Sequence, residues 1–297
     1  MAIRKVGVIG CGLMGHGIVQ VAAQAGYDVV AFEGDQKALD KGLGRIRKSL
    51  DKLAQKSVEK GKASAEDAQA KADGAFGKIT GSTTQADLAD CDLVIEAIVE
   101  DLDVKKKLFA ELNGVVKADA IFASNTSSFP IGEMGKASGR PDKMVGLHFF
   151  NPVQLMKLVE VVRADETTDD AFAAAKAFGE ACGKVPVSCK DTPGFVVNRL
   201  LVPYMSQALL MLDRGDATKE DIDAAMQFGC GYPMGPLTLT DYVGLDTTLS
   251  ILQGWTKTYP NEPAFVIPEI LERKVREGKL GRKSGEGFYK WDGDKKS

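Results

Sequence analysis

A histidine and a glutamate near the middle of the chain have the residue types needed for acid–base chemistry. His148 closes an apolar run, 144–149, and Glu160 lies twelve residues later inside another apolar run, 158–162. An imidazole exchanges protons near neutral pH. A carboxylate is costly to bury without a partner, and a His–Glu pair would supply that partner. Glu160 would then fix the tautomer of His148 and stabilise its imidazolium form, as the acidic member of a hydrolase triad does. The spacing alone is equally compatible with a buried structural pair.

A glycine fingerprint near the N-terminus predicts a dinucleotide site. Gly10, Gly12 and Gly15, with Leu13 and Met14 between the last two, form a G-x-G-x-x-G motif. The motif follows an apolar run directly and opens a helical pattern, which is the context that the fingerprint requires. The three glycines would allow a tight turn, close approach of the backbone to a pyrophosphate, and close packing of helix on strand. The phosphates would lie at the helix N-terminus. His16, the other histidine, is interpreted as a first-turn or surface residue.

An acidic residue at the end of the second expected strand indicates which cofactor binds. Glu33 follows Gly15 by 18 residues and could accept hydrogen bonds from the ribose hydroxyls of adenosine. It would also repel a 2′-phosphate, so NAD is favoured over NADP. Lys37 lies near enough to bind such a phosphate, which weakens the exclusion of NADP. Glu33 can also be interpreted as an ordinary solvated residue at the end of a strand.

The elements that must position these residues alternate between strand and helix in the first part of the chain. We therefore predict an α/β fold with a Rossmann-type, doubly wound, mostly parallel sheet over residues 1–189. The expected strands are 6–9, 28–32, 79–80, 93–97, 120–124, 144–149, 158–162 and 185–188, and the expected helices are 14–25, 36–56, 102–116 and 170–182. The segment 63–77 is expected to form the second arm of a helical hairpin.

Helical patterns dominate from Pro193 onward and predict an all-α C-terminal domain over residues 190–297. The expected helices are 195–212, 219–228, 237–252 and 267–277, with glycine and proline between them. The apolar residues of 200–212 and 237–252 could form a subunit interface or the core of this domain.

Composition narrows the class of protein. The chain has 297 residues and a net charge of −3, which gives no case for nucleic-acid binding by bulk charge. No apolar run is long enough to span a membrane, and the glycines after the first apolar run argue against a signal peptide, so we expect a cytoplasmic protein. The five cysteines form no CxxC pair, which argues against disulfides and a metal site and favours reduced core residues.

Several longer motifs carry a resemblance to a known family. They are VGVIGCGLMGHGI, CDLVIEAIVED, FASNTSS, GLHFFNP followed by MKLVEVV, DTPGFVVNRLL, GYPMGPLTLTDYVGLDT and GRKSGEGFYKW. Over essentially its whole length, the chain resembles 3-hydroxyacyl-CoA dehydrogenases, and most closely the bacterial 3-hydroxybutyryl-CoA dehydrogenases.

The resemblance implies a reaction and a set of site residues. The reaction is the NAD-dependent interconversion of L-3-hydroxyacyl-CoA and 3-oxoacyl-CoA in fatty-acid metabolism, including β-oxidation, by a homodimer. His148 would be the catalytic base and Glu160 its partner, while Ser127 and Asn198 would bond the reacting oxygen. The nicotinamide half of the cofactor would be lined by Glu100, Lys105, Ser127 and Asn151, and Lys283 would also reach the cofactor.

Seven basic residues between Lys37 and Lys60 recur every three or four positions, which places them along one helical stripe. The stripe could capture the phosphates of coenzyme A, although a solvated helix face is the more ordinary explanation. By resemblance, Lys52 and Lys56, together with Ser127, would contact the acyl-CoA substrate.

Two other functions remain open from the sequence. A dehydrogenase of the same fold could act on a free hydroxy or sugar acid, against which the pair Lys52 and Lys56 argues. A non-catalytic NAD-binding protein would be expected to lack one of His148, Glu160, Ser127 and Asn198, and all four are present.

Overall fold

The computed structural model describes residues 2–297, which form two compact units. The first unit runs to Phe195 and the second comprises Val196–Ser297. The sequence placed this division after residue 189. The segment between the two positions packs with the first unit, since Phe195 lies in one of its hydrophobic clusters.

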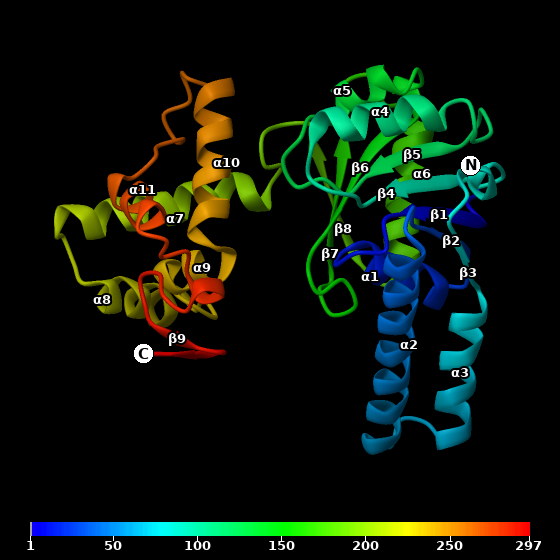
Figure 1. Ribbon diagram of the computed structural model, residues 1–297, viewed down its shortest axis with the longest axis horizontal. Helices are drawn as coiled ribbons and strands as arrows, with labels where there is room; N and C mark the ends of the chain where they lie inside the picture. The colour runs from blue at the N-terminus through cyan, green and yellow to red at the C-terminus, as the bar shows by residue number, and fades with distance from the viewer. Residues whose placement is uncertain (1) are drawn as a thin grey trace. The chain divides into compact units, whose positions relative to one another are not determined.

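An eight-stranded sheet forms the centre of the first unit (Figure 1). Its strand order is β3-β2-β1-β4-β5-β6-β7-β8. Strands β1 to β6 are parallel, whereas β7 runs antiparallel to β6 and β8 is parallel to β7. The strands are β1 Lys5–Ile9, β2 Asp28–Phe32, β3 Ile79–Ser82, β4 Leu93–Glu96, β5 Ile121–Ser124, β6 Met144–Phe149, β7 Leu158–Arg163 and β8 Val185–Lys190. The prediction of a doubly wound, mostly parallel sheet is confirmed.

The reversal at β7 follows from the length of its connection. Only residues 150–157 join β6 to β7. A parallel crossover needs a dozen or more residues, usually including a helix, so this short loop can return the chain only in the antiparallel direction. The reversal sets His148 directly opposite Glu160 in the strand register.

Helices cover both faces of the sheet. One hydrophobic cluster joins the sheet to α1 (Gly15–Gln24), α2 (Gln36–Glu59), α3 (Ala65–Gly77) and α6 (Asp169–Ala181). A second cluster on the other face includes α4 (Leu102–Leu112) and α5 (Ile131–Ala137). Short 3-10 turns occur at Gln85–Leu88 and Pro141–Lys143. The two clusters contain buried aliphatic side chains from alternate positions of the same strands, which is the pattern of a sheet covered on both sides.

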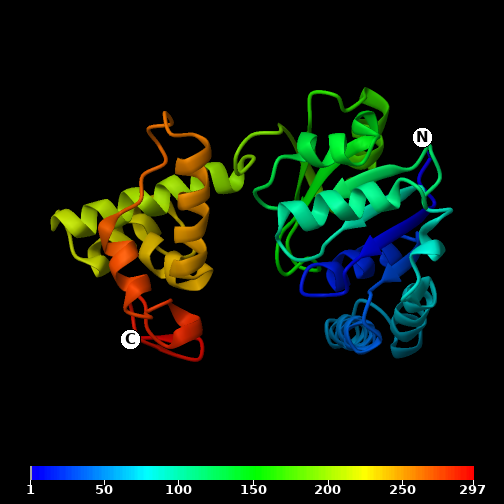
Figure 2. The same cartoon turned by 45° about the horizontal axis from the view of Figure 1, so that its top comes forward.

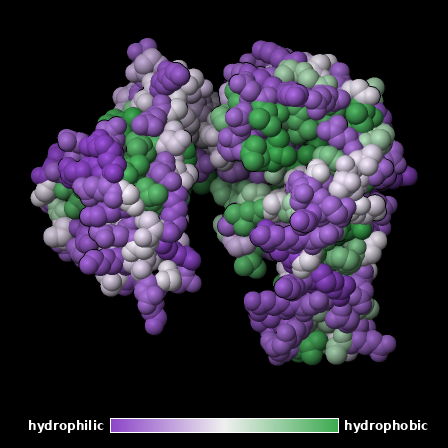
Figure 3. Space-filling model, in the orientation of Figure 1, coloured by the Kyte–Doolittle hydropathy of each residue, from purple (hydrophilic) through white to green (hydrophobic). Residues whose placement is uncertain are grey.

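The helices α2 and α3 form a hairpin that extends beyond the sheet (Figure 1), and Figure 2 shows the two helices side by side. Arg47 joins the two arms, because its Nη2 atom lies 2.6 Å from an oxygen of Asp51 and 2.6 Å from an oxygen of Asp73. The outer end of the hairpin is mainly hydrophilic (Figure 3). The prediction of a second helical arm within 63–77 is confirmed.

The second unit is mainly helical and has its own core. Its helices are α7 Val197–Arg214, α8 Lys219–Ala224, α9 Pro236–Val243, α10 Leu245–Thr258 and α11 Glu269–Arg276, with a π-helical turn at Ala225–Gly229 and a 3-10 turn at Arg282–Ser284. A short hairpin, β9 (Trp291–Asp292) and β10 (Lys295–Lys296), follows near the C-terminus. The expected single helix over 237–252 is wrong, because Gly244, with φ of 99°, ends α9 and starts α10.

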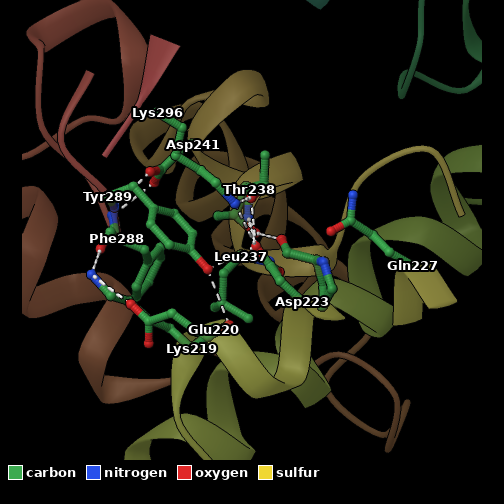
Figure 4. Close-up of polar contacts among 12 residues, drawn as sticks. Lys219, Glu220, Asp223, Gln227, Leu237, Thr238, Asp241, Phe288, Tyr289 and Lys296 are labelled. Carbon is green, nitrogen blue, oxygen red and sulfur yellow. Dashed lines mark hydrogen bonds and ion pairs between the residues drawn. The ribbon is translucent and has the colours of Figure 1, made fainter. Parts of the chain in front are cut away.

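Two buried aspartates hold the C-terminal motif in place within the second unit. Asp241 accepts hydrogen bonds from the backbone N–H groups of Phe288 and Tyr289 and from the indole N–H of Trp291, at 2.8–2.9 Å. Asp223 accepts from the N–H groups of Leu237 and Thr238 at the start of α9 and from the hydroxyl of Tyr289. Figure 4 shows both carboxylates turned toward the Tyr289 segment. The closing GEGFYKW motif is therefore anchored by charge-assisted hydrogen bonds.

Two other expectations concern cysteines and membranes. Cys11 and Cys91 are buried and Cys182 and Cys189 are half-buried, but Cys230 is exposed, so the expectation of a core position is wrong for Cys230. All five thiols are free. Within residues 2–297, no helix has both the length and the apolar character needed to cross a membrane.

Candidate active site

The carboxyl ends of the parallel strands gather most of the predicted site residues of the first unit. Gly10 follows β1, Glu33 follows β2, and Ser127 lies in the loop after β5, while His148 lies near the end of β6. From β1 the chain continues to β2 and β3 on one side and then returns to β4 on the other side of β1, so the strand order reverses between β1 and β4. Ligands of doubly wound sheets bind at this edge, at such a switch point.

The glycine loop has the shape that a bound pyrophosphate requires. Gly10 has φ of 94°, and a Cβ atom there would lie 2.6 Å from the Ala97 carbonyl oxygen. A Cβ atom on Gly15 would overlap the Gly10 carbonyl oxygen, whereas one on Gly12 would meet nothing within 4 Å. Gly12 therefore faces open space. No side chain caps the N-terminus of α1, and a helix N-terminus of this kind favours an anion through its dipole.

Glu33 and a small cavity beside the glycine loop fit the adenosine half of a dinucleotide. The cavity has a volume of about 270 Å³ and is lined by Gly10, Glu33, Ile98, Val104 and Leu108, among others. Its apolar side chains suit an adenine ring, and the carboxylate of Glu33 can accept hydrogen bonds from ribose hydroxyls; Lys107 and Glu111 also line the cavity. An oxygen of Glu33 accepts a hydrogen bond from the Cys11 N–H at 3.0 Å, which holds the carboxylate against the loop. The residues present therefore fit NAD.

His148 and Glu160 form a buried pair. Nδ1 of His148 lies 2.7 Å from Oε2 of Glu160. The histidine is 6% exposed and the glutamate is fully buried. Because a carboxylate can only accept, Nδ1 must carry the hydrogen, and Nε2 is left as the atom able to exchange a proton. The predicted pairing of these two side chains is thus present in the structure.

Packing and one backbone contact fix the position of the imidazole ring. The ring centroids of His148 and Phe150 are 4.4 Å apart, and the Phe195 ring centroid lies 5.8 Å away. Asn125, the residue directly after β5, accepts a hydrogen bond from the Phe149 N–H at 2.9 Å. Phe195 has φ of 53°, a left-handed conformation that is strained for an aromatic residue. The sequence did not single out Asn125 or Phe195, because a tertiary contact defines the role of each.

Glu100 organises the loop that carries Ser127. Its Oε1 atom accepts hydrogen bonds from the Thr126 hydroxyl at 2.6 Å and from the Ser127 N–H at 3.1 Å. Burial alone would raise the pKa of Glu100, but Lys105 and these hydrogen bonds outweigh it and hold the pKa below its usual value of 4.5. Lys105 is 1% exposed and lies 3.1 Å from Glu100 Oε2. Glu100, Lys105 and Ser127 are therefore brought together.

Another carboxylate on the same lysine, and a buried one, was missed from the sequence. Glu96, the last residue of β4, is fully buried, and its Oε1 atom lies 2.5 Å from Nζ of Lys105. Its other oxygen accepts from the Ser124 hydroxyl at 2.6 Å. The signal that led to Glu160, a carboxylate within an apolar strand, also applies to Glu96 and could have found it.

The remaining predicted residues lie elsewhere. Asn151 is exposed in the loop after β6, and Lys52 and Lys56 are exposed one turn apart on α2. In the second unit, Asn198 lies in the first turn of α7. Lys283, also in the second unit, has its Nζ atom 2.7 Å from Oδ2 of Asp246. Among residues 2–297, no group of three His, Cys, Asp or Glu side chains could hold a metal ion.

Comparison with known proteins identifies the family. Residues 5–192 match the NAD binding domain of 3-hydroxyacyl-CoA dehydrogenase, and residues 194–291 match the C-terminal domain of the same enzyme. The chain belongs to the 3-hydroxyacyl-CoA dehydrogenase family. It is accordingly an NAD-dependent dehydrogenase, and its cofactor is NAD.

Individual relatives agree with this family over nearly the whole chain. A probable 3-hydroxyacyl-CoA dehydrogenase of Caenorhabditis elegans is 49% identical, with 97% of this chain and 93% of the relative covered. A probable 3-hydroxybutyryl-CoA dehydrogenase of Deinococcus radiodurans is 48% identical, with 97% and 100% covered. The crystal structure of (S)-3-hydroxybutyryl-CoA dehydrogenase from Ralstonia eutropha superposes with a TM-score of 0.92 at 39% identity, covering 98% of this chain and 100% of that one. The predicted resemblance is confirmed.

Proposed function

We propose that this dehydrogenase interconverts L-3-hydroxybutyryl-CoA and acetoacetyl-CoA, with His148 as the catalytic acid and base. The observation that carries the proposal is the buried pair of His148 and Glu160, 2.7 Å apart, at the carboxyl edge of the sheet. NAD, when bound, accepts the hydride in the oxidative direction. Nε2 of His148 takes the proton of the 3-hydroxyl group in that direction and returns it in reduction.

Glu160 acts through His148. Its carboxylate holds the hydrogen on Nδ1 and stabilises the imidazolium that forms when Nε2 takes a proton. Full burial of Glu160 strengthens this interaction, since few water molecules can screen it. We propose that Ser127 and Asn198 each bond the reacting oxygen, on which negative charge develops in the reductive direction. The hydrogen bonds from Thr126 and Ser127 to Glu100 support this role for Ser127, because they hold its loop in one conformation.

Cofactor and substrate contacts complete the proposal. Gly10, Gly12, Leu13, Met14 and Gly15 would bind the pyrophosphate and Glu33 the adenosine ribose. The nicotinamide half would be lined by Glu100, Lys105, Ser127 and Asn151. Lys283 would also reach the cofactor, either while it keeps its hydrogen bond to Asp246 or after that bond breaks.

Coenzyme A would be bound through its phosphates by Lys52 and Lys56. Both are exposed on α2, and among the described residues neither has a carboxylate within ion-pair distance. The names of the bacterial relatives support a four-carbon acyl group.

We further propose a homodimer that forms through the second unit. Leu200 is 68% exposed and Phe228 is 88% exposed, and a subunit contact through this unit would remove both apolar side chains from water. Light scattering coupled to size-exclusion chromatography should give twice the chain mass, and a monomer at micromolar concentration would contradict this part of the proposal.

The decisive experiment follows NADH absorbance after addition of acetoacetyl-CoA to the purified protein, with NADPH and free acetoacetate in parallel. Rapid oxidation of NADH by the thioester alone is the expected result. Oxidation with free acetoacetate would instead indicate a hydroxy-acid dehydrogenase. NADH binding without turnover of either substrate would indicate a non-catalytic protein.

A further inference from the structure

Two carboxylates and one ammonium group lie in a row that is formed by the end of β4, the loop after it and α4. Nζ of Lys105 lies 2.5 Å from Glu96 Oε1 and 3.1 Å from Glu100 Oε2. Glu96 is fully buried and Lys105 is 1% exposed, but the side chain of Glu100 is 41% exposed. This row, the Glu96–Lys105–Glu100 row, therefore leads from the interior of the first unit to its surface.

The row carries one net negative charge. Glu96 accepts hydrogen bonds from three donors, which are Lys105 Nζ, the Ser124 hydroxyl and the Ile98 N–H. Each of the three contacts places a donor against a carboxylate oxygen, so Glu96 acts in this row as an acceptor that carries negative charge. Glu100 is ionised as well, because Lys105 and its own hydrogen bonds hold its pKa below 4.5. Two negative charges and one positive charge leave an excess of one.

The exposed end of the row lies where the strand order places the second half of a dinucleotide. Glu33 marks the adenosine side at β2, and the glycine loop after β1 marks the pyrophosphate. An extended dinucleotide must then continue over the ends of β4 and β5 toward His148 on β6, because the strands follow in that order. Glu100 belongs to this stretch through its bonds to Thr126 and Ser127.

We propose that the Glu96–Lys105–Glu100 row sets the relative affinity of the protein for the oxidised and reduced cofactor, with Glu96 as a buried positioning residue. The inference rests on the proposed placement of the nicotinamide half beside Glu100. The nicotinamide ring is positively charged in NAD⁺ and neutral in NADH. A net negative charge therefore favours NAD⁺, and the effect is stronger at a partly desolvated site than in water.

Without Glu96, the remaining pair of Lys105 and Glu100 is neutral. The preference for NAD⁺ should then fall, while the affinity for NADH should change little. Glu96 also fixes the position of the Lys105 ammonium, and through it the position of Glu100. The effect of the charge of Glu96 can be separated experimentally from its effect on position. When the charges of Glu96 and Lys105 are removed together, Glu100 alone remains charged, and the net charge of the row is again one negative.

The experiment is a fluorescence or calorimetric titration of the full chain with NAD⁺ and NADH separately, which reads binding and needs no turnover. We expect Glu96→Gln to lower the ratio of NAD⁺ to NADH affinity about ten-fold. The double variant Glu96→Gln/Lys105→Met should return the ratio to within about three-fold of wild type. Glu100→Gln, at the exposed end of the row, should lower the ratio of NAD⁺ to NADH affinity as Glu96→Gln does. If Glu96→Gln does not fold, this variant tests whether the charge of the row sets the ratio.

Asp92→Asn is the matched control. Asp92 directly precedes the same strand at its opposite end, where it pairs with Lys117, so its loss removes a charge beside β4 that is not part of the row. Its affinity ratio should equal that of wild type. An unchanged ratio in the folded row variants, or a double variant that stays as low as Glu96→Gln, would overturn the inference. A wild-type protein that binds neither form would instead contradict the proposed cofactor site.

Discussion

His148 is the residue on which the proposed chemistry depends most directly, because its Nε2 atom is the proton-exchanging group of a buried pair. Replacement of His148 by glutamine keeps a hydrogen-bonding side chain but removes the base. We predict that kcat for acetoacetyl-CoA reduction falls about 10²–10⁴-fold. The affinity for NADH, measured by fluorescence titration of the same preparation, should stay close to wild type. Near-normal turnover by the variant would exclude His148 as the acid and base.

The sequence allowed some of these residues to be identified and not others, for physical reasons. His148 and Glu160 stand out because a charged or titratable group in an apolar run needs a partner. The importance of Phe195 follows from its left-handed backbone and its ring beside His148, and neither has a local sequence signal. Asn125 is similar, since its contact with the Phe149 N–H depends on the register of neighbouring strands.

At the scale of elements, α2 offers a test of coenzyme A binding. Lys52→Ala/Lys56→Ala should raise the KM for acetoacetyl-CoA about five- to ten-fold, since each lost contact with a phosphate at an exposed site contributes up to about 1 kcal/mol. The kcat should not change. Acetoacetyl-pantetheine, which lacks the nucleotide phosphates, should show no such increase in KM in parallel assays.

The same helix provides the control. Lys41→Ala/Lys48→Ala removes the same charge from two other exposed lysines of α2 and should leave the KM for acetoacetyl-CoA within about two-fold of wild type, because general charge effects at exposed sites are small. Equal increases in KM for both double variants would mean that the stripe acts only through its overall charge.

The amino end of β4 supports the sheet rather than the site. Asp92 accepts hydrogen bonds from the N–H groups of Arg4 and Lys5 and pairs with Lys117. Burial alone would raise the pKa of Asp92, but these partners outweigh it and hold the pKa below 3.8. Because the pKa of Asp92 is lower in the folded than in the unfolded state, its ionised carboxylate stabilises the folded state above pH 3.8. This contribution is lost as the pH falls through the pKa of Asp92 in the folded state.

Asp92→Asn should therefore lower the free energy of unfolding by about 1–2 kcal/mol at pH 7. The difference from wild type should shrink as the pH falls below 3.8. Urea unfolding at pH 7 and at progressively lower pH measures both quantities. A difference that stays constant across this range would show that the charge of Asp92 does not contribute.

Most elements were predictable because their hydrophobic periodicity is strong, as in Asp28–Phe32 and Met144–Phe149, whose predicted limits agree with the structure. The helix α5 was missed because it is only seven residues long and contains two glycines. The break at Gly244 was missed because apolar residues continue with helical spacing on both sides of it. The antiparallel direction of β7 could have been inferred from the short loop before it, and this direction is what sets Glu160 opposite His148.

At the scale of the whole molecule, the two units have separate cores. The two clusters of the first unit contain no side chain beyond Phe195, and the cluster of the second unit begins at Leu201. The change from alternating strands and helices to helices alone predicted both units, but the C-terminal motif was interpreted only through Lys283. The anchoring of that motif by Asp223 and Asp241 depends on contacts across 14 to 66 residues, which no local pattern encodes.

Separate cores predict that the units can lose stability independently, and Asp241 provides the test. Asp241→Ala leaves the N–H groups of Phe288, Tyr289 and Trp291 buried without their acceptor, which should destabilise the second unit by about 3–5 kcal/mol. Calorimetry should then show an early transition for the second unit and a later one near the wild-type temperature. Just above the early transition, far-UV circular dichroism should retain the sheet signal of the first unit while turnover is lost. A single transition shifted as a whole would mean that the two cores unfold cooperatively.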